Sequence, residues 1–417
     1  MRFFLFALST FTAVTFCLSG EALHAENWTR FRGPNGSGIS EAKTVPVKWA
    51  EKEINWKAEL PGIGHSSPVV WGDRLFVTAA DVEAGKRFLI CLKTTDGSIT
   101  WKRTADFAKY RLHSNNSFAS NTPAVDANHV YVLWQSKQES ALVAFDHDGQ
   151  EAWRYDMGAY LHGQGGGTSP IVHEGLVFVS NDHSKGSFLV AVDSKAGKEV
   201  WKIPRAGKRA CYSTPCVFPV AGGESEIVFT HSFEGVIGVA SRTGKPSWKV
   251  DPFGRAPQRA VGSPLVTDGL VIASSGARVA EKIVVAIRPR PMGDGSKAEE
   301  VFRVTKIAPH VPTPLAYNKR LYLWTDTGVV GCVNMKTGKT IWQKRVGGNF
   351  FGSPVCIDGK LYSVDLEGNV VVLATGDKYE ELARNALGEP SRATPAVADG
   401  RLFVRTYSHV FSIGGAK

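Results

Sequence analysis

Residues 169–201 read SPIVHEGLVFVSNDHSKGSFLVAVDSKAGKEVW and contain the unit from which this chain is built. Four short apolar runs, at 170–172, 176–179, 188–192 and 199–201, are separated by polar or glycine-containing turns. Runs of valine, isoleucine, leucine and phenylalanine broken in this way are typical of β-strands joined by hairpins. The stretch therefore predicts one four-stranded antiparallel unit.

The same unit recurs along the whole chain. Each copy opens on a serine or threonine followed by proline, and eight such pairs occur: Ser67-Pro68, Thr122-Pro123, Ser169-Pro170, Thr214-Pro215, Ser263-Pro264, Thr313-Pro314, Ser353-Pro354 and Thr394-Pro395. The prolines lie roughly 40 to 55 residues apart, and a period of this length marks a repeat architecture. Four antiparallel strands repeated eight times suit a β-propeller, in which radial repetition protects the strand edges. We therefore predict an all-β fold consisting of a single eight-bladed propeller.

A second repeated feature supports this prediction. A glycine is followed four residues later by tryptophan in Gly97/Trp101, Gly149/Trp153, Gly197/Trp201, Gly244/Trp248 and Gly338/Trp342. Glycine adopts the positive φ of a tight turn easily, and tryptophan on the outer strand can fill the widening space between neighbouring blades. The fifth unit has Phe302 in place of tryptophan, and the seventh has Leu382. We expect these five tryptophans and Trp56 to be structural.

The eighth unit lacks a fourth strand, because the chain ends shortly after the apolar run at 410–413. Residues 54–57 look like an isolated fourth strand near the other end of the chain. Trp56 precedes Pro68 by 12 residues, as Trp342 precedes Pro354. We therefore predict that an N-terminal strand completes the last blade and closes the ring, which removes two exposed strand edges.

The N-terminal residues resemble an export signal. The apolar run at 3–18 is too short to span a bilayer comfortably, and residues 22–25 offer a cleavage site. We divide the chain into a signal peptide (1–25), an N-terminal extension (26–53) and the propeller (54–417). The mature chain is expected to be exported, periplasmic or otherwise extracytoplasmic, and without a transmembrane segment.

Composition excludes some classes of function. The net charge is +10, but lysine and arginine are scattered along the chain instead of forming a cluster. No aromatic stacking motif accompanies them, so a solvated basic surface explains the charge better than nucleic-acid binding does. The sequence is 43% hydrophobic and has 43 glycines, as expected for a turn-rich globular protein.

Five cysteines follow the predicted signal peptide. Cys91 and Cys332 occupy a small position on the third strand of their units, where a free cysteine behaves as a buried apolar residue. Cys211 and Cys216 could pair in an oxidising compartment, but sequence alone does not decide the geometry. No spacing resembles a zinc or haem site, so no metal site is predicted.

The turn sequences carry a family resemblance. Residues 334–342 and 193–201 are similar to the Asp-x-x-Thr-Gly-Lys-x-x-Trp signature of PQQ-type propeller repeats, and residues 241–248 follow it more loosely. The opening residues 28–35 resemble exported propellers of the outer-membrane assembly factor BamB type. The resemblance covers about residues 54 to 413 and implies the propeller fold. It implies two functional classes, since some members are quinoprotein dehydrogenases and others bind no cofactor.

The residues favour the non-catalytic class. Quinoprotein alcohol dehydrogenases carry an adjacent cysteine pair, acidic and amide ligands for calcium or a lanthanide, and a catalytic aspartate, and no motif here matches them. Residues 146–151 lack the full spacing of a calcium loop. Hydrolase motifs such as Gly-x-Ser-x-Gly are also absent from the sequence. We expect an exported binding or scaffold module of the cell envelope with no cofactor, and the alternative is a quinoprotein oxidoreductase using PQQ with calcium.

The connections that precede each Ser/Thr-Pro pair meet on one face of a propeller, around the channel mouth. Convergent polar side chains in a concave site are the usual form of a ligand site. We expect a protein or an anionic small molecule to bind there, on a protein that is peripheral to a membrane complex, with histidines adding positive charge below about pH 6.5. The predicted residues are His65, His113, His162, Tyr212, Arg259, His310 and Arg392.

Overall fold

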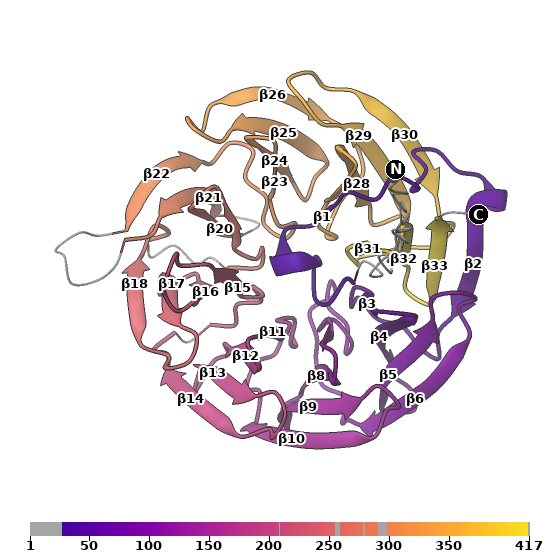
Figure 1. Ribbon diagram of the computed structural model, residues 1–417, viewed down its shortest axis with the longest axis vertical. Coiled ribbons are helices and arrows are strands. Elements are labelled where there is room, and N and C mark those ends of the chain that lie inside the picture. Colours follow the sequence, from indigo (N-terminus) through magenta and orange to yellow (C-terminus); the bar gives the residue numbers. More distant parts are fainter. Residues whose placement is uncertain (1–26, 208, 255–258, 278–279, 291–297, 416–417) are drawn as a thin grey trace, which may run out of the picture.

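The computed structural model describes residues 27–207, 209–254, 259–277, 280–290 and 298–415. It contains eight sheets arranged around a central channel, each with a four-stranded antiparallel blade and one extended by a fifth strand (Figure 1). The predicted eight-bladed propeller is confirmed. The predicted signal peptide lies outside the described residues.

Each of the first four blades is formed by consecutive strands. Blade 1 contains β3 (Val69–Trp71), β4 (Arg74–Asp81), β5 (Lys86–Lys93) and β6 (Ile99–Asp106). Blade 2 contains β7 (Ala124–Val125), β8 (His129–Gln135), β9 (Ser140–Asp146) and β10 (Glu151–Gly158). Blade 3 contains β11 (Ile171–His173), β12 (Leu176–Asn181), β13 (Phe188–Asp193) and β14 (Glu199–Pro204). Blade 4 contains β15 (Cys216–Phe218), β16 (Glu226–His231), β17 (Gly235–Ala240) and β18 (Pro246–Val250).

The remaining blades follow the same order until the last. Blade 5 contains β19 (Leu265–Thr267), β20 (Leu270–Ala277), β21 (Ala280–Arg288) and β22 (Glu299–Val304). Blade 6 contains β23 (Leu315–Tyr317), β24 (Arg320–Trp324), β25 (Val329–Asn334) and β26 (Thr340–Arg345). Blade 7 contains β27 (Val355–Ile357), β28 (Lys360–Val364), β29 (Asn369–Ala374) and β30 (Glu381–Ala386). Blade 8 contains β31 (Ala396–Ala398), β32 (Arg401–Arg405), β33 (His409–Gly414) and, from the N-terminal side, β2 (Ile54–Glu59).

Burial changes from the inner to the outer strands of a blade. Every residue of β12 is buried, and so is nearly every residue of β13, because both faces of these strands are covered by neighbouring blades. In the outer strand β14, buried and exposed side chains alternate more, and Trp201 is buried among exposed neighbours. A two-sided core explains why the second and third runs of each unit are almost continuously apolar.

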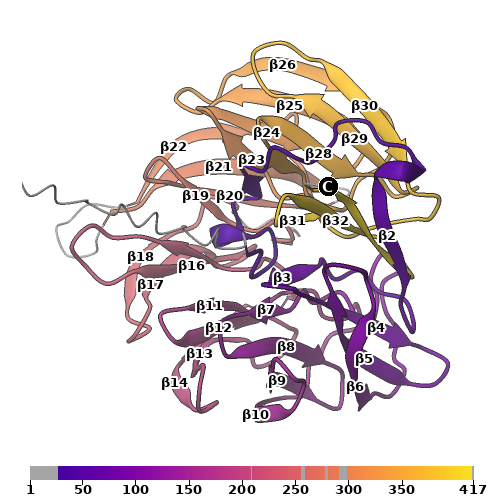
Figure 2. The ribbon, with the colours of Figure 1, turned by 45° about the vertical axis from the view of Figure 1, so that its right-hand side comes forward.

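Closure of the ring occurs as predicted. Strand β2 pairs antiparallel with β33, with Trp56 opposite Ser412 and Lys57 opposite Phe411. The indigo β2 therefore runs beside the yellow C-terminal strands (Figures 1 and 2). Both chain ends contribute to one blade, so no blade is left with three strands.

The glycine–tryptophan feature joins neighbouring blades. The Trp153 indole covers Gly197 of the next blade so closely that an added Cβ would lie 2.6 Å from the ring. The same indole N–H donates to the Ser194 carbonyl oxygen (3.0 Å). Equivalent bonds join Trp56 to Thr94, Trp101 to His147, Trp201 to Ser241 and Trp342 to Gly376. Trp248 is different, because it donates to Glu226 of its own blade.

The serines and threonines of the Ser/Thr-Pro pairs form a ring of hydroxyls around the channel. Ser67 N–H donates to Thr122 Oγ1 (2.9 Å), and Thr122 N–H donates to Ser169 Oγ (3.0 Å). Further links of this kind run from Thr214 to Ser263, Ser263 to Thr313, Thr313 to Ser353, Ser353 to Thr394 and Thr394 to Ser67. Serine and threonine alternate around the whole ring. In these seven links a hydroxyl satisfies a buried backbone N–H from the connection before the preceding blade, which explains the hydroxyl-bearing residue before proline.

The N-terminal segment, residues 28–40, crosses the channel on the side of the hairpins that join first and second strands. Trp28 is fully buried and pairs with Val70 of β3. The segment then forms the short 3-10 helix η1 (Pro34–Gly36) in the centre of Figure 1, followed by β1 (Ile39–Ser40), which adds in parallel to β27. It closes one end of the channel, and a second 3-10 helix, η2 (Glu51–Glu53), precedes β2.

Arginines fix the N-terminal segment at the channel axis. Arg30 donates to the Pro215 carbonyl oxygen, and Arg32 donates to the Thr313 carbonyl oxygen at 2.9 Å. Burial lowers the pKa of Arg30 to about 10 and the pKa of Arg32 to about 9, so both are protonated at neutral pH. Neither forms an ion pair with an acidic residue in the described part of the chain.

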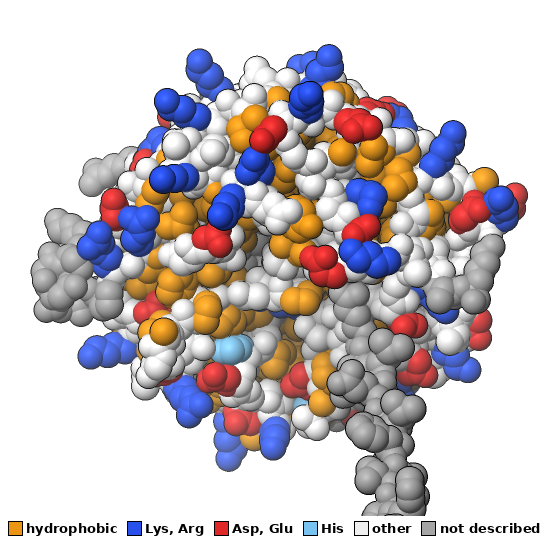
Figure 3. All heavy atoms as spheres, turned by 45° about the horizontal axis from the view of Figure 1, so that its top comes forward, with side chains coloured by type: hydrophobic (Ala, Val, Ile, Leu, Met, Phe, Trp, Pro, Cys, Tyr) orange, Lys and Arg blue, Asp and Glu red, His pale blue; other side chains and the backbone are white. Residues whose placement is uncertain are grey.

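The described cysteines are all buried and free, and Cys211 and Cys216 do not form a disulfide. Among the described residues, no helix has the length and apolar character needed to cross a membrane. On the face shown in Figure 3, lysine and arginine side chains are dispersed among acidic ones.

Candidate functional site at the channel mouth

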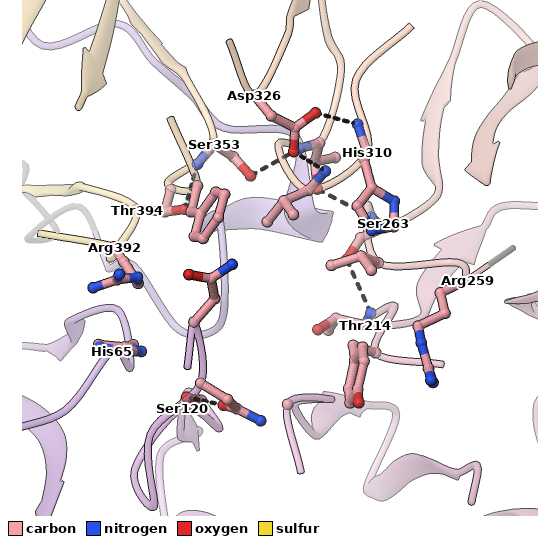
Figure 4. Close-up of a pocket in the computed structure, with 18 of the residues that line it drawn as sticks. His65, Ser120, Thr214, Arg259, Ser263, His310, Asp326, Ser353, Arg392 and Thr394 are labelled. Atoms are coloured by element: carbon pink, nitrogen blue, oxygen red, sulfur yellow. Dashed lines mark hydrogen bonds between the residues drawn. The ribbon is translucent and has the colours of Figure 1, made fainter. Parts of the chain in front are cut away.

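A cavity of about 590 Å³ opens at the channel mouth. The mouth is on the face of the propeller opposite the one at which the N-terminal segment crosses the channel. The lining of the cavity includes Phe31 of the N-terminal segment, here called the floor, and all eight residues of the hydroxyl ring. Figure 4 labels Thr214, Ser263, Ser353 and Thr394 of this ring. The N-terminal segment crosses the channel below the mouth (Figure 1), and its Phe31 is part of the cavity lining.

Six of the seven residues predicted from sequence line this one cavity: His65, His113, Tyr212, Arg259, His310 and Arg392. They come from six different connections, so only the circular arrangement of the blades brings them together. His162 is not part of the lining, but its Nε2 lies 3.4 Å from Arg259 Nη1.

Arg392 forms one wall of the cavity. Its guanidinium lies over the Phe351 ring at 5.7 Å and over the Tyr407 ring at 5.2 Å. Tyr407 also stacks against His65, with ring centroids 5.2 Å apart. Arg392 forms no ion pair with a described acidic residue, and its buried Nε has no hydrogen-bond partner. The two rings hold the guanidinium in place while leaving its charge without a counterion.

Arg259 and Arg209 form another cationic region, across the cavity from Arg392 (Figure 4 labels Arg259 and Arg392). Arg259 Nη1 donates to the Ala210 carbonyl oxygen at 2.9 Å, which fixes the side chain. Arg209 lies over the Phe233 ring at 6.0 Å. Neither arginine forms an ion pair with a carboxylate in the described ranges, so this wall also carries uncompensated positive charge.

Asp326 is the single carboxylate in the described lining, and sequence reasoning missed it. It accepts hydrogen bonds from the backbone N–H groups of His310 (2.8 Å) and Val311 (2.9 Å). Lys282 Nζ lies 3.3 Å from Asp326 Oδ2. Asp326 lies in the turn between β24 and β25, and Lys282 lies on β21, so neither belongs to the connections considered from sequence. The carboxylate is already satisfied and does not neutralise the arginines.

The expectation that the histidines add charge is wrong for three of them. Burial, reinforced by Arg392 and Arg405, lowers the pKa of His65 to about 3. Burial and Arg259 lower the pKa of His162 to about 4. Burial also lowers the pKa of His310. These imidazoles are neutral at physiological pH, and positive charge at the mouth comes from arginine.

The residues present do not fit a calcium–PQQ pair. The described residues contain no group of three His, Cys, Asp or Glu side chains able to hold a metal ion. Asp326 is held by Lys282 and two backbone N–H groups, and hard cations need several free oxygen ligands. The lining arginines match only the carboxylates of such a cofactor and not its metal ion.

Similar proteins are found in two functional classes. The outer membrane protein assembly factor BamB of Moranella endobia (strain PCIT) is 24% identical over 246 residues, which cover 54% of this chain and 59% of that protein. The polyvinylalcohol dehydrogenase of a Pseudomonas species is 27% identical over 192 residues, which cover 40% of this chain and 28% of the enzyme. This chain therefore spans less than two thirds of the length of either relative.

Solved structures show the same fold. The crystal structure of BamB from Moraxella catarrhalis has a TM-score of 0.63 at 16% identity, covering 87% of this chain and 96% of that one. A europium-containing methanol dehydrogenase has a TM-score of 0.67 at 14% identity, covering 93% and 90%. At these identities the likeness is one of fold alone.

The family match is more specific. Residues 49–214, 283–378 and 326–413 match the family described as outer membrane protein assembly factor BamB. The matched segments make up more than half of the chain and include blades from its N-terminal and its C-terminal parts. The chain therefore belongs to this family of PQQ-like-repeat propellers.

Proposed function

We propose that this protein is an exported, non-catalytic binding module of the cell envelope whose channel-mouth cavity holds the anionic groups of a partner. The export signal expected in residues 1–25 and the membership in the BamB family support the location. The name of that family, an assembly factor, supports a role peripheral to a membrane complex.

One observation carries the proposal: among the described residues, three arginines at the mouth lack an acidic partner, whereas the carboxylate of Asp326 beside them is already paired with Lys282. Arginine presents planar donors that match carboxylate and phosphate groups. A cavity walled by Arg209, Arg259 and Arg392 therefore favours an anion over a cation.

The test compares two charged peptides. Fluorescein-labelled hexaglutamate and hexalysine are titrated with the protein, and binding is followed by fluorescence anisotropy. We expect hexaglutamate to bind and to weaken as salt rises, because exposed charges are screened. Arg259→Ala combined with Arg392→Ala should reduce this binding, while Lys198→Glu, in the β13–β14 turn on the opposite face, should leave it unchanged. Loss of binding in Lys198→Glu but not in the double variant would place the binding site on the face opposite the channel mouth and would contradict the proposal.

The alternative is a PQQ-dependent oxidoreductase. It is favoured by the similarity to polyvinylalcohol dehydrogenase and to the quinohemoprotein alcohol dehydrogenase ADH IIB of Pseudomonas putida, which is 28% identical over 130 residues. Titration with PQQ and Ca²⁺, followed by dye reduction with alcohols and sugars as substrates, separates the two functions. Stoichiometric binding with turnover would replace the proposal by the alternative.

A further inference from the structure

We infer that the channel-mouth cavity takes a small organic diacid whose two acidic groups bind on opposite walls, one at Arg392 and the other at Arg259. This inference rests on the proposed function and specifies the ligand more narrowly. It is carried by the separation of the two cationic walls, by the apolar surface between them and by the closed floor.

The two cationic walls are distinct sites. Arg392 precedes blade 8, and Arg259 precedes blade 5, so the two side chains enter the cavity from different sides of the ring (Figure 4). Each is held by its own contacts, Arg392 by two aromatic rings and Arg259 by the Ala210 carbonyl oxygen. Fixed guanidinium groups lose little freedom on binding, which favours a ligand that reaches both.

The lining of the cavity is partly apolar. Phe31 lies on the floor, and Val261, Val311, Phe351 and Leu366 contribute apolar side chains to the lining. A ligand that carries charge throughout the part buried between the two walls would place that charge against these side chains, which is costly. An apolar body with an acidic group at each end matches this distribution.

The size of the cavity limits the ligand. A volume of about 590 Å³ falls within the range of small-molecule sites. The N-terminal segment, which includes Phe31, lies across the centre of the channel (Figure 1) and obstructs the passage of a chain through the ring. A small molecule is therefore favoured over a threaded polypeptide.

Two buried arginines beneath the cavity floor also favour a ligand with two acidic groups. Arg30 and Arg32 flank Phe31 in the chain, are at least nine-tenths buried and have no acidic partner among the described residues. Their charges are screened little by water, because buried charges are screened less than exposed ones. The cavity floor therefore also favours a ligand of charge −2 over one of charge −1.

The test is isothermal titration of the full-length mature protein with straight-chain α,ω-dicarboxylates from succinate to sebacate. Each is compared with the monocarboxylate of the same carbon number. We expect the best dicarboxylate to bind at least about tenfold more tightly than its monocarboxylate, since one charged hydrogen-bonded contact is worth about that factor. We also expect an optimum chain length, set by the distance between the walls.

Variants of the two arginines test whether each one binds an acidic group of the ligand. Arg392→Gln and Arg259→Gln should each reduce the ratio of dicarboxylate to monocarboxylate affinity to about two, which is the statistical factor for two equivalent ends. The matched control, Lys198→Gln, should keep the full ratio. Because the readout is a ratio within one protein, a general loss of stability does not imitate it.

A ratio of about two in the unmodified protein, or a high ratio that survives both arginine variants, would overturn the inference. If hexaglutamate still binds in that case, the proposed function stands and only the diacid is wrong. If neither the peptide nor any carboxylate binds, both proposals fail.

Discussion

His65 shows how a buried position changes the chemistry of one residue. Burial of its ring, reinforced by the positive charges of Arg392 and Arg405, lowers its pKa to about 3. In an unfolded chain the pKa of histidine is about 6.5. Below that pH the unfolded state takes up a proton that the folded state does not, and the folded state loses stability as the pH falls.

His65→Gln tests this linkage. The stability that His65 contributes through its neutral form is fully present above pH 6.5 and declines toward pH 3. Between pH 7.5 and pH 4.5 the parent protein should therefore lose about 2–3 kcal/mol more free energy of unfolding than the variant. Urea unfolding at the two pH values measures the difference, and equal losses in both proteins would contradict it.

The hydroxyl ring gives a second prediction for a single residue. Thr122→Val keeps the shape of the side chain but removes the acceptor of the buried Ser67 N–H. An unsatisfied buried donor costs about 1–3 kcal/mol. Thr122→Ser keeps the acceptor and should cost less, and chemical unfolding of both variants distinguishes a role in hydrogen bonding from one in packing.

Among the structural elements, the turn before each outer strand determines how blades contact one another. Gly197 has a φ of +69° and lies beneath the Trp153 indole of the preceding blade. Glycine is thus required at this position for two reasons: the positive φ of the backbone and the lack of space beneath the Trp153 ring. Gly175, in the turn between β11 and β12, has a φ of +77° but open space around it.

Comparing Gly197→Ala with Gly175→Ala separates the two requirements. Both place an alanine in left-handed backbone, which costs about 1–2 kcal/mol. Gly197→Ala must in addition displace Trp153, so its loss of stability should be larger by about 1–3 kcal/mol. Equal melting temperatures for the two variants would show that displacing Trp153 from Gly197 costs no free energy of unfolding.

For the molecule as a whole, the N-terminal residues have two separable roles. Residues 28–40 close the channel, and β2 completes blade 8. Deleting residues 27–53 should lower the melting temperature but leave a closed ring. Deleting residues 27–59 also exposes an edge of β33, and exposed edges promote aggregation. Thermal unfolding with light scattering should show aggregation before unfolding only for the longer deletion, and identical behaviour would contradict a role of β2 in closure.

The repeat made most of this structure predictable. The number of blades, the closing strand and six lining residues all follow from equivalent positions in successive units. Phe31, Arg30 and Arg32 were not predicted, because residues 28–40 have no counterpart in another unit. Asp326 was missed because it lies in a hairpin turn inside a blade, and the low pKa of His65 depends on neighbours that are distant in sequence.

The alternation of serine and threonine around the hydroxyl ring bears on how such a ring can grow. Each threonine hydroxyl accepts from a serine N–H, and each serine hydroxyl accepts from a threonine N–H, in every link described. An alternating circle returns to its starting residue only when the number of members is even. Duplication or loss of a single blade would place two like residues side by side, whereas duplication of a blade pair preserves the order. Four such pairs give the ring of hydroxyls a fourfold pseudosymmetry, so a change in blade number that keeps the alternation must add or remove two blades at a time.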